Sequence, residues 1–415
     1  MIDGRFEEAT VIDTNTLYKI TGTCKEGSVE QLVYDNRVDY HLTTIKCASY
    51  YYRDFIVRLM IKKSVLITGV TGYVGIHLLS RLVRQSNIDR IFCVTRYKDH
   101  NSFWSAIKSQ ANQFNITMDV SDIKPKLDIV NIDLAQNQNS ILPGLQKFKQ
   151  SVKEVHHLAC DGNYGHSLEY FQPWINTTKE LIQFCMDSTH TKSLYAVGSY
   201  GQHIIDSINN DEDYYWINGY FKYKRWLYNY MLEKIDEGLQ GILIEPGVVV
   251  GTIDPGQKYS FWRITRIFAA TGYAFNYPMV FTPMDMLIDN YILAQNHPNE
   301  CPKVISPLIP KYLYVNKAVQ KLLPDLKMIE YEKFRVLMQH VMPDKAKYFG
   351  PNFLRSIYGP KLIATFHPFY DTTKYVSKDT TDYLSSCKSL TDAVEQGFTD
   401  RNKYISALEK KHYLV

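Results

Sequence analysis

The glycine-rich string TGVTGYVG, Thr68–Gly75, constrains the fold of this chain more than any other feature. It follows the apolar run Val65–Ile67, and the residues after it have the apolar spacing of an amphipathic helix. In such a strand, turn and helix, Gly69 suits a tight turn, Gly72 lets the backbone approach a phosphate, and Gly75 allows the helix to pack closely on the strand. The pattern predicts a Rossmann-type dinucleotide-binding domain.

Predicted strands and helices alternate from residue 63 to residue 251, which is typical of a parallel sheet covered by helices on both faces. We therefore expect an α/β fold, built on a Rossmann-type doubly wound parallel sheet. The expected strands are Val65–Thr68, Ile91–Thr95, Leu127–Ile132, Glu154–Ala159, Ser193–Val197 and Gly241–Glu245, and the expected helices are Ile76–Gln85, Trp174–Met186 and Gly219–Asp236.

Two regions flank this domain. Residues 1–62 contain alternating β-branched and aromatic runs, which predict a β-rich N-terminal extension with strands at Val11–Ile20, Val29–Tyr34 and Val38–Tyr52. Residues 252–415 are a mixed segment rich in Tyr, Phe and Pro. By analogy with other doubly wound enzymes, we expect the second region to be a smaller C-terminal subdomain that forms a lid over the substrate.

Composition excludes several classes of protein. The formal net charge is only +4 and no long basic run occurs, which argues against a nucleic-acid partner. Seven widely spaced cysteines without a CxxC pair favour neither a disulfide framework nor a metal site, and they suit a reducing cytoplasm. No signal sequence and no stretch of about 18 apolar residues is present, so we expect a cytoplasmic protein without a membrane span.

The choice of cofactor depends on the string CVTRYKD at the end of the second predicted strand. NAD-dependent enzymes place an acidic residue there to bind the ribose, whereas this chain has Arg96. A guanidinium at this position would pair with the 2′-phosphate of NADPH, which we therefore prefer. The alternative is that Arg96 is only a solvated surface charge. Asp133, after the third strand, is placed to bond the adenine amino group or to have no such role.

Three residues form a candidate catalytic set. Tyr220 and Lys224 are four residues apart on a predicted helix and so share one face. A tyrosine that donates a proton near neutral pH needs its pKa of about 10 lowered, and an ammonium one turn away has that effect. Ser199, at the end of the preceding strand, would share the substrate oxygen with Tyr220. The alternative is an ordinary helix face beside a loop serine.

The adjacent histidines of VHHLAC offer a further choice. His156 and His157 point to opposite faces of a strand, and no carboxylate or cysteine is spaced to complete a metal site. We therefore expect no metal, and a contact from His157 to the cofactor at the strand end.

Taken in order, the motifs resemble the thioester reductase domains of nonribosomal peptide and polyketide synthetases and of carboxylic acid reductases, within the extended short-chain dehydrogenase/reductase superfamily. The matching strings, from residue 64 to about 295, are TGVTGYVG, CVTRYKD, VNIDL, EVHHLAC, INTTKELIQ, AVGSYG, the Tyr220 and Lys224 pair, EPGVVVG and FTPMD. The resemblance implies hydride transfer from NADPH to a thioester on the phosphopantetheine arm of a carrier protein. The product would be an aldehyde, with further reduction to an alcohol left open.

The resemblance also assigns residues. It gives the catalytic roles to Ser199, Tyr220 and Lys224. The chain departs from the family pattern at two positions, where Glu245 replaces an arginine and Gly198 replaces a serine. The residues expected at the cofactor are Thr68, Gly69, Thr71, Gly72, Tyr73, Val74, Gly75, Arg96, Lys108, Asp133, Leu134, His157, Ala159, Asn176, Pro246, Gly247 and Val248.

Two other functions remain open at this stage. One is an extended-family sugar-nucleotide epimerase or dehydratase, or a hydroxysteroid-type dehydrogenase. These enzymes generally use NAD, which Arg96 disfavours. The other is a non-catalytic NADP(H)-binding sensor, which would need the glycine turn but not Tyr220 and Lys224.

Overall fold

A computed structural model describes residues 9–13, 16–20, 62–136, 140–162, 166–187, 192–207, 218–251, 260–309, 313–341 and 388–399. The chain forms two compact units, the first of residues 1–63 and 85–89 and the second of residues 64–84 and 90–415. In the first unit, β1 (Ala9–Asp13) and β2 (Thr16–Ile20) pair antiparallel, which confirms the strands predicted at Val11–Ile20. The strands predicted at Val29–Tyr34 and Val38–Tyr52 lie outside the described residues.

A seven-stranded sheet in the order β13-β8-β7-β6-β3-β4-β5 forms the centre of the fold. Its strands pair in parallel, and the strand order reverses between β3 and β6, as in doubly wound sheets that bind ligands at their carboxyl edge. This confirms the predicted fold class. The strands are β3 (Lys63–Thr68), β4 (Ile88–Thr95), β5 (Leu127–Asn131), β6 (Val152–His157), β7 (Ser193–Val197), β8 (Gln240–Ile244) and β13 (Val304–Ile305).

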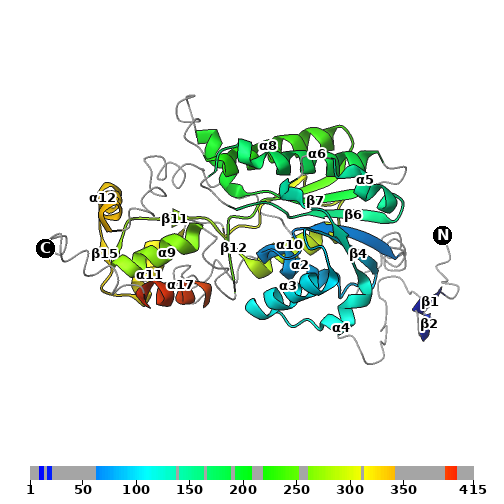
Figure 1. Cartoon of the computed structure of the whole chain (residues 1–415), viewed down its shortest axis with the longest axis horizontal. Coiled ribbons are helices and arrows are strands. Elements are labelled where there is room, and N and C mark those ends of the chain that lie inside the picture. The colour runs from blue at the N-terminus through cyan, green and yellow to red at the C-terminus, as the bar shows by residue number, and fades with distance from the viewer. Residues whose placement is uncertain are drawn as a thin grey trace, which may run out of the picture. The chain divides into compact units, whose positions relative to one another are not determined.

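Helices cover both faces of the sheet (Figure 1). One face carries α2 (Tyr73–Leu82), α3 (His100–Gln113) and α10 (Met284–Asn296), and the other carries α6 (Gln172–Met186) and α8 (Gly219–Asp236). Because both faces are covered, β3 and β8 contain runs of successive apolar residues, Val65–Ile67 and Ile242–Ile244. The described residues also include the short helices α4 (Val120–Ile123) and α5 (Leu142–Leu145).

A buried polar cluster attaches α10 to the sheet. The Tyr291 hydroxyl lies 3.1 Å from His156 Nδ1 and donates to the Tyr195 carbonyl oxygen at 3.2 Å. The Gln295 amide donates to Glu154 Oε2 at 2.7 Å. Buried polar groups need such partners, so the cluster determines how α10 seats on β6 and β7. His156 thus has a structural role in this cluster.

The C-terminal region has an apolar core of its own and also contributes to the sheet. Strand β12 (Phe281–Pro283) pairs in parallel with β9 (Val248–Val250), and β13 pairs with β8. Phe268, Phe275 and Phe334 pack edge to face in the second core. The remaining elements are α9 (Ser260–Thr271), β10 (Tyr273–Ala274), β11 (Pro278–Met279), β14 (Leu313–Tyr314), α11 (Val315–Leu322), β15 (Lys327–Met328), α12 (Tyr331–Val341) and α17 (Lys388–Thr399).

Candidate active site

The glycine turn joins β3 to α2 with little room for side chains. Gly69 has a φ of 73°, in the left-handed region that favours glycine, and an added Cβ would lie 2.7 Å from the Ala159 nitrogen. A Cβ at Gly75 would lie 2.1 Å from the Gly69 carbonyl oxygen. Gly72 is exposed, and a Cβ there would meet only the Gly69 oxygen, at 3.1 Å. Backbone packing therefore requires Gly69 and Gly75, whereas at Gly72 an added Cβ would make one tight contact with a backbone oxygen.

The N-terminus of α2 fits an anionic group. Gly72 is its N-cap residue, no side chain caps the helix, and its first turn contains no acidic residue. The first amides of a helix and its dipole then favour a phosphate. The Tyr73 side chain is buried against Phe114, so Tyr73 could reach a phosphate only through its backbone. Thr71 and Val74 are half-buried.

A chain of buried hydrogen bonds supports the turn from below. The Thr178 hydroxyl donates to the Trp174 carbonyl oxygen at 2.8 Å, so its oxygen accepts from His157 Nε2, 3.0 Å away. His157 Nδ1 then accepts from the Thr68 hydroxyl at 2.9 Å. The Thr68 oxygen in turn accepts the amides of Leu158, at 3.2 Å, and Ala159, at 3.1 Å. The chain ties β3, β6 and α6 together beneath the glycine turn.

This bonding determines the state of His157. Burial, together with the nearby charge of Lys224, lowers the pKa of His157 to about 3, so its ring is neutral near pH 7. An unfolded histidine takes up a proton below about pH 6.5, so this ring costs stability as the pH falls from that value toward 3. The ring of His157 is not available for the predicted contact with a cofactor, because it is buried and both of its nitrogens are already hydrogen-bonded. Only the backbone of His157 and Ala159 is left for such a contact.

The ends of β4 and β5 carry the predicted groups for the adenosine half of a dinucleotide. Arg96 directly follows β4 and is exposed, and it forms no ion pair with any described residue. The Asn131 amide donates to the Tyr97 carbonyl oxygen at 2.7 Å, which joins the two strand ends. Asp133 accepts from the Ala135 amide at 3.0 Å. Arg96 is therefore available to an external anion, and Asp133 stabilises its own turn.

Tyr220 and Lys224 lie together on α8, as predicted. The Lys224 ammonium is 5.7 Å from the centre of the Tyr220 ring and donates to the Val197 carbonyl oxygen at 2.7 Å. Lys224 is only 4% exposed, and burial lowers its pKa, while the negative charge of Glu245 offsets part of this effect. Val197 ends β7 two residues before Ser199. The lysine thus connects the two segments that carry the predicted hydroxyl groups.

Ser199 lies between two backbone hydrogen bonds, one to the last residue of β8 and one to the segment that follows β8. The Gly198 amide donates to the Ile244 carbonyl oxygen at 2.7 Å, and the Tyr200 amide donates to the Pro246 carbonyl oxygen at 2.9 Å. The Ser199 hydroxyl accepts from the Gly201 amide at 3.3 Å. Ser199 is therefore held beside Pro246, which is one of the residues predicted to lie at the nicotinamide.

The segment Pro246–Val248 is anchored on its other side by the C-terminal region. The Gly247 amide donates to the Thr282 hydroxyl at 2.9 Å, and the Val248 amide donates to the Val280 carbonyl oxygen at 2.8 Å. A Cβ at Gly247 would lie 2.4 Å from that same oxygen, so only glycine fits there. Parallel pairing of β9 with β12 continues this attachment.

In the described part of the chain, three other residues predicted to bind the cofactor have no direct link to the glycine turn or to Ser199. Asn176, on α6, accepts from the Gln172 amide at 2.9 Å. Lys108 is exposed on α3 and Leu134 is buried in the sheet core. No hydrogen bond connects these three with the glycine turn or with Ser199 among the residues that the structure describes. Their cofactor roles stay predictions.

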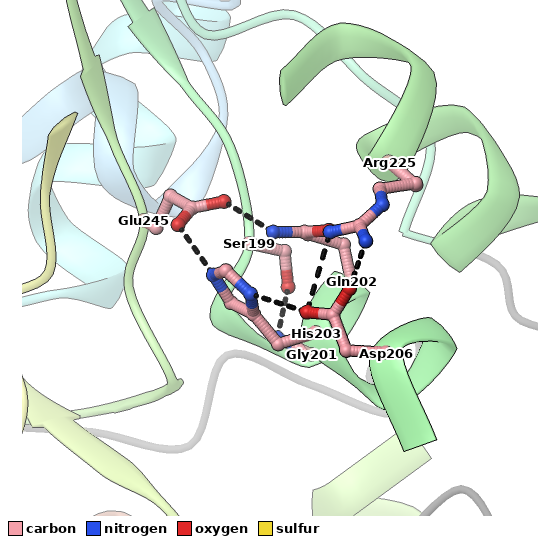
Figure 2. A network of polar contacts seen from close by, with 7 residues as sticks. All are labelled: Ser199, Gly201, Gln202, His203, Asp206, Arg225 and Glu245. Carbon is pink, nitrogen blue, oxygen red and sulfur yellow. Dashed lines mark hydrogen bonds and ion pairs between the residues drawn. The ribbon is translucent and has the colours of Figure 1, made fainter. Parts of the chain in front are cut away.

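One group of polar residues beside Ser199 was missed in the sequence. It forms a closed ring of side chains (Figure 2), with members Gln202, His203, Asp206, Arg225 and Glu245. The only signal was Glu245, an acidic residue before the Pro-Gly pair. Tyr200 and Tyr223, which adjoin predicted site residues, are both buried and pack against other aromatic rings.

Neither a metal centre nor a membrane span stands out in the part of the chain that the structure describes. No three His, Cys, Asp or Glu side chains among these residues are grouped to hold a metal ion. None of the described helices combines the length and apolar character needed to cross a membrane. Burial raises the pKa of the Cys160 thiol, near Lys224, to about 11, so this thiol is protonated near pH 7.

Comparison with known proteins identifies a family whose model matches more than half of the chain. The model of a family of NAD-binding domains, described as Male sterility protein, matches residues 67–290. The 3-methylorcinaldehyde synthase of Phoma sp is 29% identical over 135 residues, which are 32% of this chain and 5% of that protein. The matched segment thus spans about a twentieth of this relative.

Solved structures share the fold. The terminal R domain from the myxalamid PKS-NRPS biosynthetic pathway superposes with a TM-score of 0.60 and 17% identity, over 85% of this chain and 92% of that chain. A thiolation-reductase di-domain from an archaeal non-ribosomal peptide synthetase gives 0.55 and 12% identity, over 86% and 79%. The resemblance inferred from the motifs is confirmed for family and fold.

Two glycine variants separate packing from ligand binding at the turn. Gly75→Ala should destabilise the protein by more than about 2 kcal/mol, because its Cβ would overlap the Gly69 carbonyl oxygen. Gly72→Ala should lose less stability than Gly75→Ala, because its Cβ would lie 3.1 Å rather than 2.1 Å from that oxygen. It should weaken dinucleotide binding at least about tenfold, because its Cβ would enter the space predicted for the phosphates. Urea unfolding and cofactor titration measure the two effects. Equal effects of both variants on stability would contradict this reading.

The hydrogen-bond chain below the turn is tested at Thr68. Thr68→Val keeps the shape but leaves His157 Nδ1 and two amides without their partner, so we expect a loss of about 1–3 kcal/mol in the free energy of unfolding. Thr68→Ser is the matched control, since it keeps the hydroxyl. If the valine variant were as stable as the serine variant in urea, the bonds would contribute nothing.

Proposed function

The chain belongs to the family described as Male sterility protein, and from this premise we propose that it is an NADPH-dependent reductase of carrier-bound thioesters. In this proposal it reduces an acyl or peptidyl thioester, held by a phosphopantetheine-bearing carrier protein, to an aldehyde. The matched residues 67–290 contain Ser199, Tyr220 and Lys224 as well as the glycine turn. A protein that only bound the dinucleotide would need the turn alone.

The observation that carries the proposal is the placement of Lys224. A lysine is seldom buried, yet here it is 4% exposed, bonded to the carbonyl oxygen of Val197 and close to the Tyr220 ring. An ammonium at this place favours loss of a proton from a neighbouring phenol. Burying the Lys224 ammonium costs desolvation free energy. A catalytic role explains why the chain tolerates this cost, because Tyr220 would have to donate a proton during the reaction.

We assign NADPH to the site on the chemistry of its residues. The amides at the start of α2 would hold the diphosphate, and Arg96 would pair with the 2′-phosphate. Pro246, Gly247 and Val248 would lie along the nicotinamide, because their segment is fixed beside Ser199. When bound, the reduced nicotinamide supplies a hydride.

Residues of this chain would stabilise the carbonyl oxygen of the thioester and supply the proton that it takes up. As the hydride reaches the thioester carbonyl carbon, negative charge develops on the carbonyl oxygen. Ser199 donates a hydrogen bond to this oxygen, Tyr220 transfers a proton to it, and the Lys224 charge stabilises the tyrosinate that remains. The resulting thiohemiacetal breaks its C–S bond, which restores a C=O group as the aldehyde. The pantetheine sulfur takes up the released proton.

The names of two similar proteins support the proposed substrate class. The similar protein from Phoma sp is named for the synthesis of an aldehyde, 3-methylorcinaldehyde. One of the similar folds is a reductase joined to a thiolation domain. A carrier-bound thioester as substrate and an aldehyde as product are consistent with both.

An acyl-pantetheine assay tests the activity. We expect wild-type protein to oxidise NADPH in the presence of an acyl-pantetheine thioester and to release free thiol and aldehyde. Tyr220→Phe should lower turnover at least about 100-fold with NADPH binding retained, because it removes only the proton donor. Tyr230→Phe, on the same helix, is the control and should be fully active. Absence of NADPH oxidation by the wild type would refute the proposal.

The cofactor preference is tested at Arg96. Arg96→Gln should weaken NADPH binding by roughly 10- to 100-fold and leave NADH binding nearly unchanged, because the guanidinium contacts only the 2′-phosphate. Arg90→Gln, at the opposite end of β4 and paired with Asp128, serves as control. Dissociation constants come from nicotinamide fluorescence. Tighter binding of NADH than NADPH by the wild type would reverse the assignment.

A further inference from the structure

The five polar side chains beside Ser199 close on themselves, and we call this group the polar ring (Figure 2). Glu245 Oε2 lies 3.0 Å from His203 Nε2, and His203 Nδ1 lies 3.0 Å from Asp206 Oδ2. Asp206 pairs with the Arg225 guanidinium. Arg225 donates to Gln202 Oε1 at 2.8 Å, and the Gln202 amide donates to Glu245 Oε1 at 3.2 Å, which completes the ring.

The geometry requires a protonated histidine in the ring. Each nitrogen of His203 faces an oxygen of a carboxylate, and an ionised carboxylate can only accept a hydrogen bond. Both nitrogens must therefore carry a proton, which makes His203 a cation. With two carboxylates, one imidazolium and one guanidinium, the formal charges of the polar ring sum to zero.

The surroundings of His203 agree with that charge. Burial lowers the pKa of His203, but the hydrogen bonds and charges of Glu245 and Asp206 outweigh it, so the pKa is raised above its usual value. Among the described residues, the aromatic rings of Tyr200 and Tyr228 also lie near the His203 imidazole, with ring centres 5.2 Å and 5.5 Å away. Arg225 binds the same Asp206 carboxylate that faces His203.

The buried end of the polar ring makes it costly to break. Glu245 and Gln202 are completely buried, and a buried carboxylate that loses its partner is strongly destabilising. Gly198 provides the space for this carboxylate, because a Cβ at Gly198 would lie 3.1 Å from Glu245 Cγ. The buried position of the Glu245 side chain thus depends on the absence of a side chain at Gly198.

The members of the polar ring come from three segments that contain or adjoin predicted site residues. Gln202, His203 and Asp206 belong to the 3₁₀ segment η5 (Tyr200–Ser207), which starts directly after Ser199. Arg225 follows Lys224 on α8, and Glu245 precedes Pro246. The ring therefore bridges the same two segments as the backbone bonds on either side of Ser199.

We propose that the polar ring positions Ser199 against the Pro246–Val248 segment, and that it does so only while His203 is protonated. His203 and Glu245 act through Ser199 and are positioning residues, with no contact to substrate. The kinetic part of this inference rests on the proposed reductase function. Its structural part does not, because the amides of Gly198 and Tyr200 report on it directly.

Hydrogen exchange at these two amides is the decisive experiment. His203→Phe should lower the protection factors of Gly198 and Tyr200 at least about tenfold, because it removes both bonds of the imidazolium. His203→Gln, whose amide can still donate to Glu245, should restore part of the protection. His297→Gln breaks an exposed His–Glu pair on the surface and should change neither amide. Unchanged protection in His203→Phe would overturn the proposal.

A pH series separates positioning from mere packing. Because the pKa of folded His203 is raised, its contribution is complete below about pH 6.5 and is lost as the pH rises through the folded value. The wild-type protection factors should therefore step down over that range, and those of His203→Gln should not. A step that persists in His203→Gln would exclude His203 as its origin.

Kinetics on the acyl-pantetheine substrate complete the test. We expect His203→Phe to lower kcat about tenfold with the KM for NADPH unchanged, since the phosphate turn is untouched. Should this variant fail to fold, Asp206→Asn replaces it, because the Asp206 side chain is 47% exposed. Reduced protection with unaltered kcat would overturn the link to Ser199. If the wild type reduces no thioester, the proposed function fails while hydrogen exchange still decides the structural part.

Discussion

The carboxyl edge of the sheet depends on one close backbone approach, between Gly69 and Ala159. No side chain fits between them, so β3 and β6 meet at the point where the strand order reverses. Thr68 fastens the same contact from below through two amides and His157. The start of α2 and the segment after β6 are thereby held together. Every later feature of the candidate site is built on this frame.

Local patterns predicted most of the central fold, because they are properties of short segments. The apolar runs of the buried strands and the spacing in Gly219–Asp236 needed no knowledge of distant residues, and β7 and α8 have the predicted bounds. Strand β13 was missed because it has only two residues and is defined by its partner β8 rather than by a run of its own.

The arrangement of the candidate residues was predictable where spacing along one element brings them together, as for Tyr220 and Lys224. It was not predictable where long-range partners decide the role. Two histidines illustrate this. His157 was expected to contact a cofactor, and what the structure adds is that its buried ring is neutral and bonded to two threonine hydroxyls. His203 drew no attention, yet between two carboxylates it must be charged. The residue type is the same, and the partners set opposite states.

The strands contributed by the C-terminal region limit how this protein can be divided or recombined. The predicted boundary at residue 251 separates β9 from its neighbour β12, and β8 from its neighbour β13. A fragment cut there would leave β8 as an open edge, which invites pairing with other chains. It would also remove Thr282, the partner of the Gly247 amide. A chimaera meant to exchange the substrate-binding part should therefore keep residues through Ile305 with the sheet.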